Sequence, residues 1–178
     1  MRVIGGSAKG RKFTVPKGFD SSPTTDYAKE GLFNILEHKF NMFNLRVLDL
    51  CCGTGSMSYE FASRGAEEVL ALDKNPKCVK YVAQNAELFR LDQITARRMD
   101  VNAYLKNTNH TWDVIVADPP FDADVLNKWV ETIFKKNMLN EGGMLIFEHD
   151  EFKTFSNHEH FNESRKYGHV HFSFFTLD

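Results

Sequence analysis

The chain contains 178 residues, of which 42% are hydrophobic and 26% charged, and its formal net charge is −2. This balance is ordinary for one soluble globular domain, and no apolar run approaches the roughly 18 residues that cross a bilayer, which argues against a membrane-spanning protein. The first residues lack the apolar core of a signal peptide, and three cysteines do not make a disulfide framework. We therefore expect a cytoplasmic protein.

The first 19 residues are basic and contain no acid. Their basic residues are Arg2, Lys9, Arg11, Lys12 and Lys17. Residues 3–4 and 12–15 predict two short strands joined across a glycine-rich turn, and hence a basic hairpin extension over residues 1–22. A basic segment on a near-neutral body suits a polyanionic partner, although a solvated, charge-rich hairpin explains the charge equally well.

From residue 23 onward, helical and strand patterns alternate. Helices are predicted from residue 23 to about 40 and at 56–64, 76–91, 101–105 and 123–136. Strands are predicted at 47–50, 69–72, 94–98, 114–117 and 144–147. This alternation indicates a parallel sheet with helices on both faces. Residues 167–177 are strand-like with no helix among them, so we expect a closing antiparallel hairpin and one α/β domain, with its core over residues 23–178.

The first predicted strand leads into a glycine-containing turn from Asp49 through Cys51 and Gly53 to Gly55. Two glycines allow a sharp turn and a close backbone approach to a ligand where a helix begins, although any strand-to-helix turn can use them. Asp73 ends the second strand 24 positions later, where doubly wound folds place the acid that binds ribose hydroxyls. The alternative role for Asp73 is N-cap of the next helix.

Asp100 follows the third predicted strand at the same edge of the sheet. A carboxylate there can accept a hydrogen bond from an adenine amino group, or it can cap the short helix that follows. Ligands of open α/β sheets bind at this edge, beyond the carboxyl ends of the strands.

The four residues Asp118-Pro119-Pro120-Phe121 follow the fourth predicted strand. The prolines cannot continue a hydrogen-bonded ladder and hold the backbone rigid. Asp118 and the Pro119 carbonyl offer acceptors, and Phe121 offers a ring for stacking. This arrangement suits a flat substrate that presents an NH2 group, such as a purine or cytosine base.

Three motifs together resemble the class I S-adenosylmethionine-dependent methyltransferases. They are Asp-x-x-x-Gly-x-Gly from Asp49, the acid Asp73, and Asp-Pro-Pro-Phe from Asp118. Further elements resemble the RsmD family, whose members methylate N2 of a guanine in bacterial small-subunit (16S) ribosomal RNA. These elements are residues 2–6, 9–11, 23–26 and 30–34 and the pairs Glu148-His149 and Tyr167-Gly168.

The resemblance implies a doubly wound, seven-stranded, mostly parallel sheet with an antiparallel C-terminal hairpin. It implies S-adenosyl-L-methionine as cofactor, held by Asp49, Cys51, Gly53, Gly55, Asp73 and Asp100. It implies ribosomal RNA or the small ribosomal subunit as partner, bound by Arg2, Lys9, Arg11, Lys12, Thr24 and Thr25. Catalysis falls to Asp118, Pro119, Pro120 and Phe121, in a monomer that needs no metal. Asp118 then orients the target amine, a role that requires no raised pKa.

The chain departs from the family at three arginine positions, where it carries Ser22, Tyr27 and Lys29. Those arginines suit contacts to RNA phosphate or cofactor, and an uncharged residue removes bidentate contacts. Two alternatives therefore stand beside the leading hypothesis: an adenine-N6 methyltransferase on RNA or DNA, and a cofactor-binding RNA-interaction protein without turnover. The pairs His158/His160 and His169/His171 are interpreted as surface residues, and Trp112, Trp129, Phe172, Phe174 and Phe175 as core.

Overall fold

The computed structural model describes residues 1–15, 19, 24–119 and 123–177. Its helices are α1 (Asp26–Lys39), η1 (Met42–Asn44), α2 (Ser56–Ser63), α3 (Pro76–Phe89), α4 (Val101–Asn107) and α5 (Ala123–Lys135). Its strands are β1 (Arg46–Asp49), β2 (Glu68–Asp73), β3 (Ile94–Arg98), β4 (Trp112–Ala117), β5 (Leu139–His149), β6 (Phe161–Tyr167) and β7 (Val170–Thr176). Every predicted helix and parallel strand is present, with ends that differ by a few residues. No helix in these ranges is long and apolar enough to cross a membrane.

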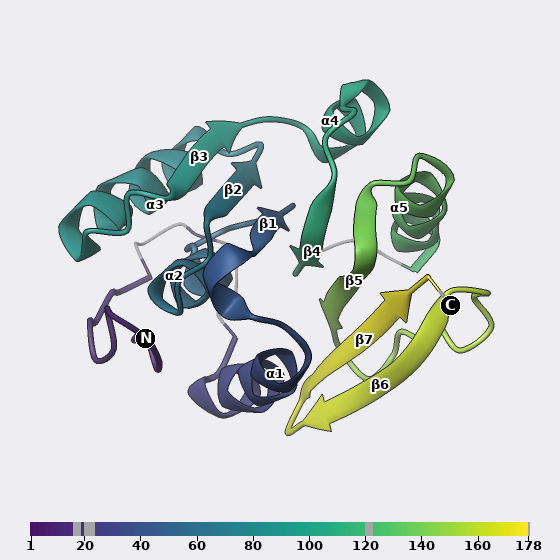
Figure 1. Cartoon of the computed structure of the whole chain (residues 1–178), viewed down its shortest axis with the longest axis horizontal. Coiled ribbons are helices and arrows are strands. Elements are labelled where there is room, and N and C mark those ends of the chain that lie inside the picture. Colours follow the sequence, from purple (N-terminus) through teal and green to yellow (C-terminus); the bar gives the residue numbers. More distant parts are fainter. Residues whose placement is uncertain (16–18, 20–23, 120–122, 178) are drawn as a thin grey trace.

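The strands form one sheet in the order β3-β2-β1-β4-β5-β7-β6, and β7 runs antiparallel to both of its neighbours, β5 and β6 (Figure 1). Strands β1 to β5 are parallel because a helix follows each of β1 to β4 and returns the chain to the starting edge. The order reverses between β1 and β4, which is where doubly wound sheets bind ligands.

Two buried clusters fill the space between the sheet and its helices. Consecutive strand residues such as Val47 and Leu48 belong to different clusters, because successive side chains of a strand point to opposite faces of the sheet. Helices α1, α2 and α3 pack in the first cluster, and α4 and α5 in the second. Trp112, Trp129, Phe172, Phe174 and Phe175 are all buried, which confirms their prediction as core residues.

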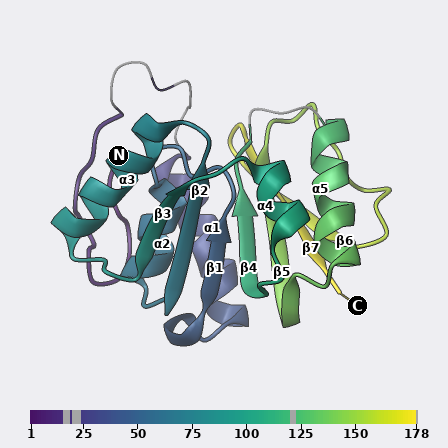
Figure 2. The same ribbon diagram turned by 90° about the horizontal axis from the view of Figure 1, so that it is seen from above.

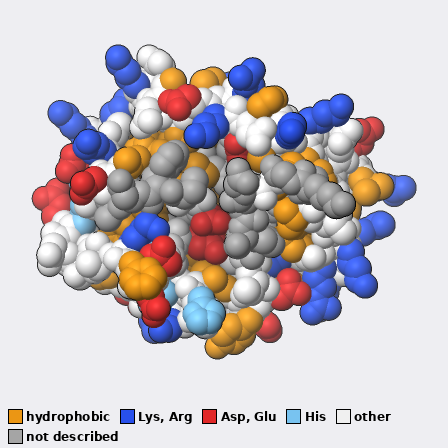
Figure 3. Space-filling model, turned by 180° about the vertical axis from the view of Figure 1, so that it is seen from behind, with side chains coloured by type: hydrophobic (Ala, Val, Ile, Leu, Met, Phe, Trp, Pro, Cys, Tyr) orange, Lys and Arg blue, Asp and Glu red, His pale blue; other side chains and the backbone are white. Residues whose placement is uncertain are grey.

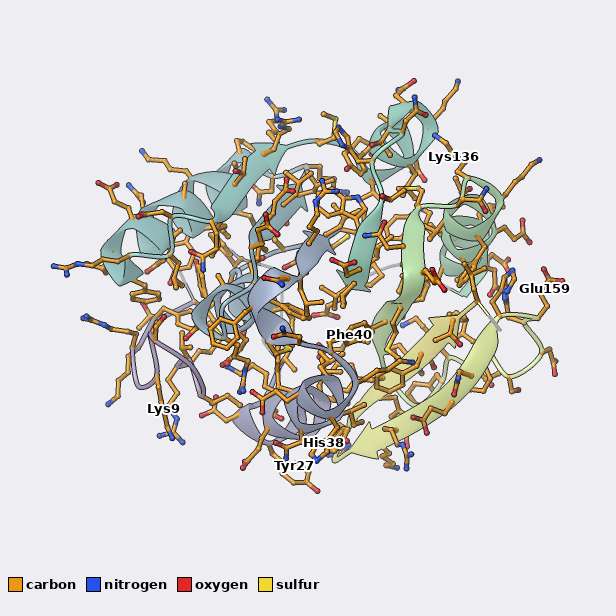
Figure 4. The ribbon with its side chains drawn as sticks, viewed as in Figure 1. Lys9, Tyr27, His38, Phe40, Lys136 and Glu159 are labelled. Atoms are coloured by element: carbon orange, nitrogen blue, oxygen red, sulfur yellow. The ribbon has the colours of Figure 1, made fainter. Side chains whose placement is uncertain are left out.

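Helices α4 and α5 are also joined by polar contacts. The Lys136 ammonium, at the end of α5, donates to the carbonyls of Leu105, Lys106 and Thr108 at 2.7–2.9 Å (Figure 4). These carbonyls lie at the carboxyl end of α4, where a positive charge is favourable. Trp129 Nε1 donates to Asn102 Oδ1 over 2.8 Å at the other end of the contact. The second helix layer is therefore fixed beside β4 and β5.

The predicted C-terminal hairpin is present but displaced. Its turn lies at Gly168-His169, where Gly168 has φ +66°, and its first strand is β6, which begins before the predicted segment and ends at residue 167. We missed β6 because it is an edge strand with polar and charged residues on both faces, including the exposed pair Glu163 and Arg165 at 2.6 Å. Strand β5 is likewise longer than predicted, because it continues through Gly142 and Gly143.

The N-terminal segment forms a looser hairpin than predicted. Within residues 1–15 and 19, the only bridge pair is Arg2 with Lys12, in place of two strands. Backbone hydrogen bonds join Val3 to Arg11 and Phe13 to Met1 at 2.9 and 3.1 Å. The segment lies beside α2 and α3, and the two termini are far apart (Figure 2). Part of the predicted extension, residues 16–18 and 20–22, lies outside the described residues.

Candidate active site at the carboxyl ends of the strands

Three carboxyl groups lie at the carboxyl ends of adjacent strands. Asp49 ends β1, Asp118 directly follows β4, and Glu148 is the second-last residue of β5. The residues two positions earlier, Val47, Val116 and Ile146, belong to one buried cluster. The three carboxyl groups therefore point to the same face of the sheet, the one covered by α1 and α2.

Burial dominates the electrostatics of this group. It raises the pKa of Asp49 to about 7, that of Asp118 to about 6 and that of Glu148 to about 8. The negative charge of Asp118 raises the pKa of both other groups further. Ser58 Oγ donates to Asp49 over 2.6 Å, and Thr24 Oγ1 donates to Glu148 over 2.5 Å, which lowers the pKa of each acceptor. Lys153 lowers the pKa of Asp118.

A cavity of about 280 Å³ opens beside these carboxyl groups. Its lining residues are Leu50, Cys51, Gly53, Asp73, Lys74, Asn75, Cys78, Met99, Asp100, Val101, Asn102, Asp118 and Trp129. We call it the Asp73 cavity. It combines apolar walls with a few polar groups at the switch point of the sheet, as expected of a cofactor site. The structure thus brings together five predicted site residues: Cys51, Gly53, Asp73, Asp100 and Asp118.

Asp73 is held by backbone groups at the mouth of this cavity. Gly53 N donates to one carboxylate oxygen over 3.0 Å, and Asn75 N donates to the other over 2.8 Å. The N-cap of α3 is Asn75, whose side chain accepts from Lys77 N, so the alternative N-cap role for Asp73 is wrong. Asp100 does cap α4, through a 3.0 Å hydrogen bond from Ala103 N, and it lines the cavity as well.

The glycine turn packs tightly against α2 and α3. Gly55 has φ +79°, and a Cβ added to it would lie 2.7 Å from the Tyr59 ring and 2.9 Å from Val82. A side chain is therefore excluded here on both conformational and steric grounds. Cys51 is half-buried and Cys52 is buried, and desolvation raises the pKa of both thiols. Thiols that stay protonated are poor nucleophiles, which argues against nucleophilic catalysis by either cysteine.

A second, smaller hollow of about 40 Å³ adjoins the first. Its lining residues are Thr24, Asp49, Cys51, Cys52, Gly53, Thr54, Ser56, Met57, Val116 and Asp118. We call it the Thr24 hollow. Ser56 Oγ is buried here without a hydrogen-bond partner among the described residues. Asp118 lines both the Asp73 cavity and the Thr24 hollow. Pro119 is buried, and Pro120 and Phe121 lie outside the described residues.

The remaining predicted residues lie on the N-terminal side of the site. Lys9, Arg11 and Lys12 are exposed and form no ion pair with a described residue, and Lys9 extends from the N-terminal segment into solvent (Figure 4). Arg2 is also exposed but pairs with Asp26 at 2.8 Å. Thr24 is buried on Glu148, whereas the exposed Thr25 caps α1 by accepting from Ala28 N over 3.1 Å.

The structure describes two of the three positions at which the family usually has an arginine, Tyr27 and Lys29. Neither residue presents a free positive charge at the surface. Lys29 is fully buried, and its Nζ donates to the Arg2 carbonyl over 2.6 Å and lies 3.3 Å from the buried Glu60. A contact between Lys29 and phosphate is therefore excluded in this structure. Tyr27 is 66% exposed and stands beside Tyr167 at a ring distance of 5.7 Å. Ser22 lies outside the described residues.

Sequence reasoning missed Glu148 as a site residue. Its position in the sequence could have indicated this role. Glu148 lies near the end of its strand, at the same edge of the sheet as Asp49 and Asp118, and its side chain points to the same face. A larger and more open hollow of about 760 Å³ lies elsewhere, between α1 and Tyr167. It contains none of the predicted catalytic or cofactor residues, so the Asp73 cavity and the Thr24 hollow are the candidate active site.

The fold is shared with solved methyltransferases. The structure named "Putative methyltransferase yhhF from Escherichia coli" matches with a TM-score of 0.85 and 20% identity, over 98% of this chain and 96% of that chain. The T. thermophilus 16S rRNA N2 G1207 methyltransferase (RsmC), solved with AdoMet and guanosine, matches with a TM-score of 0.69 and 24% identity, over 89% of this chain and 45% of that chain. The chain has the class I methyltransferase fold, as predicted.

Sequence similarity then gives the family. The family model described as "Conserved hypothetical protein 95" matches residues 1–176, and the chain belongs to this family of RsmD- and YlbH-like methyltransferases. The Bacillus subtilis (strain 168) "Putative rRNA methyltransferase YlbH" is 34% identical over 159 residues, which are 84% of this chain and 83% of that protein. The Escherichia coli (strain K12) "Ribosomal RNA small subunit methyltransferase D" is 28% identical over 148 residues, which are 83% of this chain and 71% of that protein.

Proposed function

We propose that this protein uses S-adenosyl-L-methionine to methylate the exocyclic N2 of a guanine in bacterial small-subunit (16S) ribosomal RNA. The observation that carries the proposal is the position of Asp118, which lines both the Asp73 cavity and the Thr24 hollow. A methyl donor held in the first and an amine presented to the second would meet at this carboxylate. The names of the relatives, which are ribosomal RNA methyltransferases, support the choice of substrate.

The residues of the Asp73 cavity fit the cofactor. Asp73 is fixed by two backbone donors and offers its remaining lone pairs to ribose hydroxyls. Asp100 supplies an acceptor suited to an adenine amine, and Gly53 and Cys51 line the cavity close to the backbone. Gly55 allows the turn to pack against Tyr59 and Val82, and Asp49 and the unpartnered Ser56 hydroxyl line the adjoining Thr24 hollow. S-adenosyl-L-methionine, when bound, supplies an electrophilic sulfonium methyl group.

The chain then has to orient a poor nucleophile. The N2 lone pair of guanine is delocalised into the ring, so the amine reacts only when its N–H bonds are held and the lone pair is directed at the methyl group. Asp118 and the Pro119 carbonyl accept these two hydrogen bonds in the proposal. Stacking on the base is assigned to Pro120 and Phe121, which lie outside the described residues. Proximity and electrostatic positioning supply most of the acceleration.

Asp118 serves this role as a carboxylate. Its pKa of about 6 leaves it mainly ionised at neutral pH, so that it accepts hydrogen bonds before the reaction. The amine becomes strongly acidic only after methyl transfer, when the same carboxylate accepts the released proton. The Thr24 hollow has room for the reacting edge of a base and not for a whole base.

The N-terminal hairpin gives the RNA backbone a place to bind. Lys9, Arg11 and Lys12 are exposed cations without an ion-pair partner among residues 1–15, 19, 24–119 and 123–177, so all three are available for phosphates. A guanine within a duplex has to be unstacked and turned outward to reach Asp118, at a cost of a few kcal/mol.

The proposal is tested by methyl transfer to small ribosomal subunits from a strain that lacks the enzyme. Radiolabelled methyl groups are followed by nucleoside analysis of the digested RNA. We expect N2-methylguanosine. N6-methyladenosine would indicate the adenine enzyme instead, and binding of subunits without incorporation would indicate an RNA-interaction protein without turnover.

A further inference from the structure

Glu148 stands next to Asp118 and is not accounted for by the reaction as described so far. Ala117 pairs in register with Phe147 on the neighbouring parallel strand, so the next residues, Asp118 and Glu148, are adjacent across β4 and β5. Neighbouring strands are about 4.8 Å apart, and the two side chains point to the same face. Their electrostatic interaction is large enough to raise the pKa of Glu148.

The Glu148 carboxyl group is incompletely satisfied. One oxygen, Oε2, accepts from Thr24 Oγ1 over 2.5 Å, and Oε1 accepts no hydrogen bond from a described residue. A buried carboxylate normally has several donors, and a lone unpaired one is costly. Glu60, the other buried glutamate, accepts from Ile4 N and faces Lys29. Glu148 has no such cation, and at 6% exposure it is less completely enclosed than Glu60 at 0%.

We propose that the free oxygen of Glu148 accepts the N1–H of the target guanine, and so selects guanine among bases that carry an amine. This inference rests on the proposed function. Guanine presents two adjacent donors, N1–H and N2–H, along one edge. Asp118 and Glu148 present two adjacent acceptors from neighbouring strands, so the two edges are complementary.

The same geometry rejects the alternative bases. Adenine and 2,6-diaminopurine have an unprotonated N1, which is an acceptor and would face the ionised Glu148 carboxylate without a proton between them. A protonated Glu148 could donate to that N1, so the bases are compared above about pH 8, where the carboxylate is ionised. A site built around a hydrogen bond discriminates strongly against an analogue that lacks it, because the buried group is left unpaired. The N1–H donor also favours the charged carboxylate and so opposes the effect of burial on the pKa of Glu148.

The test compares guanine with a base that keeps the 2-amine and lacks the N1–H, because an amine replaces the 6-oxo group. The guanine that the wild-type protein methylates is mapped, and a synthetic RNA around it, assembled into small subunits, carries either guanine or 2,6-diaminopurine, which keeps the 2-amine and has no N1–H. We expect kcat/KM for guanine to exceed that for 2,6-diaminopurine by at least about 100-fold. In Glu148→Gln the ratio should fall below about tenfold, because the amide can donate to an unprotonated N1 as well as accept from N1–H.

A control variant separates base recognition from a general effect of the substitution. Glu159→Gln makes the same chemical change at an exposed site near α5 and should alter nothing (Figure 4). Equal methylation of the two bases by the wild type, or an unchanged ratio in Glu148→Gln, would overturn the inference alone. No transfer to any guanine would reject the proposed function, and the inference with it.

Discussion

At the scale of single residues, Asp118 has the sharpest expected effect. Asp118→Ala removes the acceptor that orients the target amine, and kcat should fall by about 100-fold or more, as for the loss of one positioned polar group in other active sites. Binding of S-adenosyl-L-methionine should persist, since Asp73 and the glycine turn are untouched. Single-turnover methyl transfer and calorimetric cofactor binding measure the two effects separately. Turnover close to that of the wild type would refute the role of Asp118.

The sequence alone does not show what Lys29 does in place of a common arginine of the family. In the structure its ammonium neutralises Glu60 in the interior, and the same group holds the Arg2 carbonyl. Burial of a charge depends on a partner from a distant helix, which no local pattern contains. Asp73, Asp100 and Asp118, by contrast, were predictable because each follows a strand whose end is visible in the sequence.

At the scale of elements, the basic hairpin is fixed to α2 by its backbone. Ser7 N donates to the Ser63 carbonyl over 2.7 Å, and Ser63 Oγ joins Ala8 N and the Gly5 carbonyl. Gly6 has φ +71°, and a Cβ there would lie 1.8 Å from the Ser63 carbonyl oxygen. The hairpin is therefore a rigid part of the protein, and not a loosely attached tail.

Gly6→Ala should detach this hairpin. The matched control is Gly10→Ala, which has a similar φ of +84° and no atom within 4 Å of the added Cβ, so it carries only backbone strain of about 1–2 kcal/mol. We expect Gly6→Ala to weaken RNA binding clearly more than Gly10→Ala, with cofactor affinity unchanged in both. Filter binding of RNA and thermal unfolding measure the effects, and equal behaviour of the two variants would contradict a steric role for Gly6.

The charges of the hairpin make a separate prediction. Replacing Lys9, Arg11 and Lys12 together by alanine removes three cations that face solvent. For single-stranded RNA the slope of log K against log salt should become less steep by about 2, since each phosphate contact contributes about 0.7. RNA affinity measured over a range of salt concentrations gives this slope. An unchanged slope would show that the hairpin is structural and binds no phosphate.

At the scale of the whole molecule, the three buried carboxyl groups couple stability to pH. Their pKa values in the folded protein, about 7, 6 and 8, lie above the ordinary values of 3.8 and 4.5. The folded state therefore binds protons more tightly than the unfolded state, and this contribution to stability is complete below about pH 4 and is lost as pH rises through the folded values.

Glu148→Gln isolates one of these groups. The amide cannot ionise, so the variant should gain stability relative to the wild type as pH rises from about 5 through 8, with the difference levelling off above that value. Titration of His149, whose pKa burial lowers, cancels in this comparison. Unfolding by denaturant at a series of pH values measures the difference. If the stability of the wild type rose relative to that of the variant over this pH range, the raised pKa of Glu148 would be contradicted.

The sequence predicted the parallel half of the sheet better than its antiparallel end. Strands β1 to β5 alternate with helices, and the change of hydrophobic period marks each boundary. Strand β6 pairs only with β7 and has no buried face of its own, so its residues show no apolar alternation. Asp49, Asp118 and Glu148 lie close together because of the order and register of β1, β4 and β5. The order and register follow from tertiary strand pairing, and no local spacing in the sequence reveals them.

The charged edge strand β6 has a consequence for how the protein behaves in a crowded cell. A strand with one unpaired edge can recruit another chain, and charged side chains are a common defence against such association. Exposed Arg165 and Lys166 occupy this edge, and β3 closes the opposite edge with Arg97 and Arg98. Both edge strands of the sheet thus carry exposed cations. Acidic side chains lie near the centre of the face shown in Figure 3. The charges that hide the strand pattern of β6 in the sequence are the ones expected to oppose its pairing with another chain.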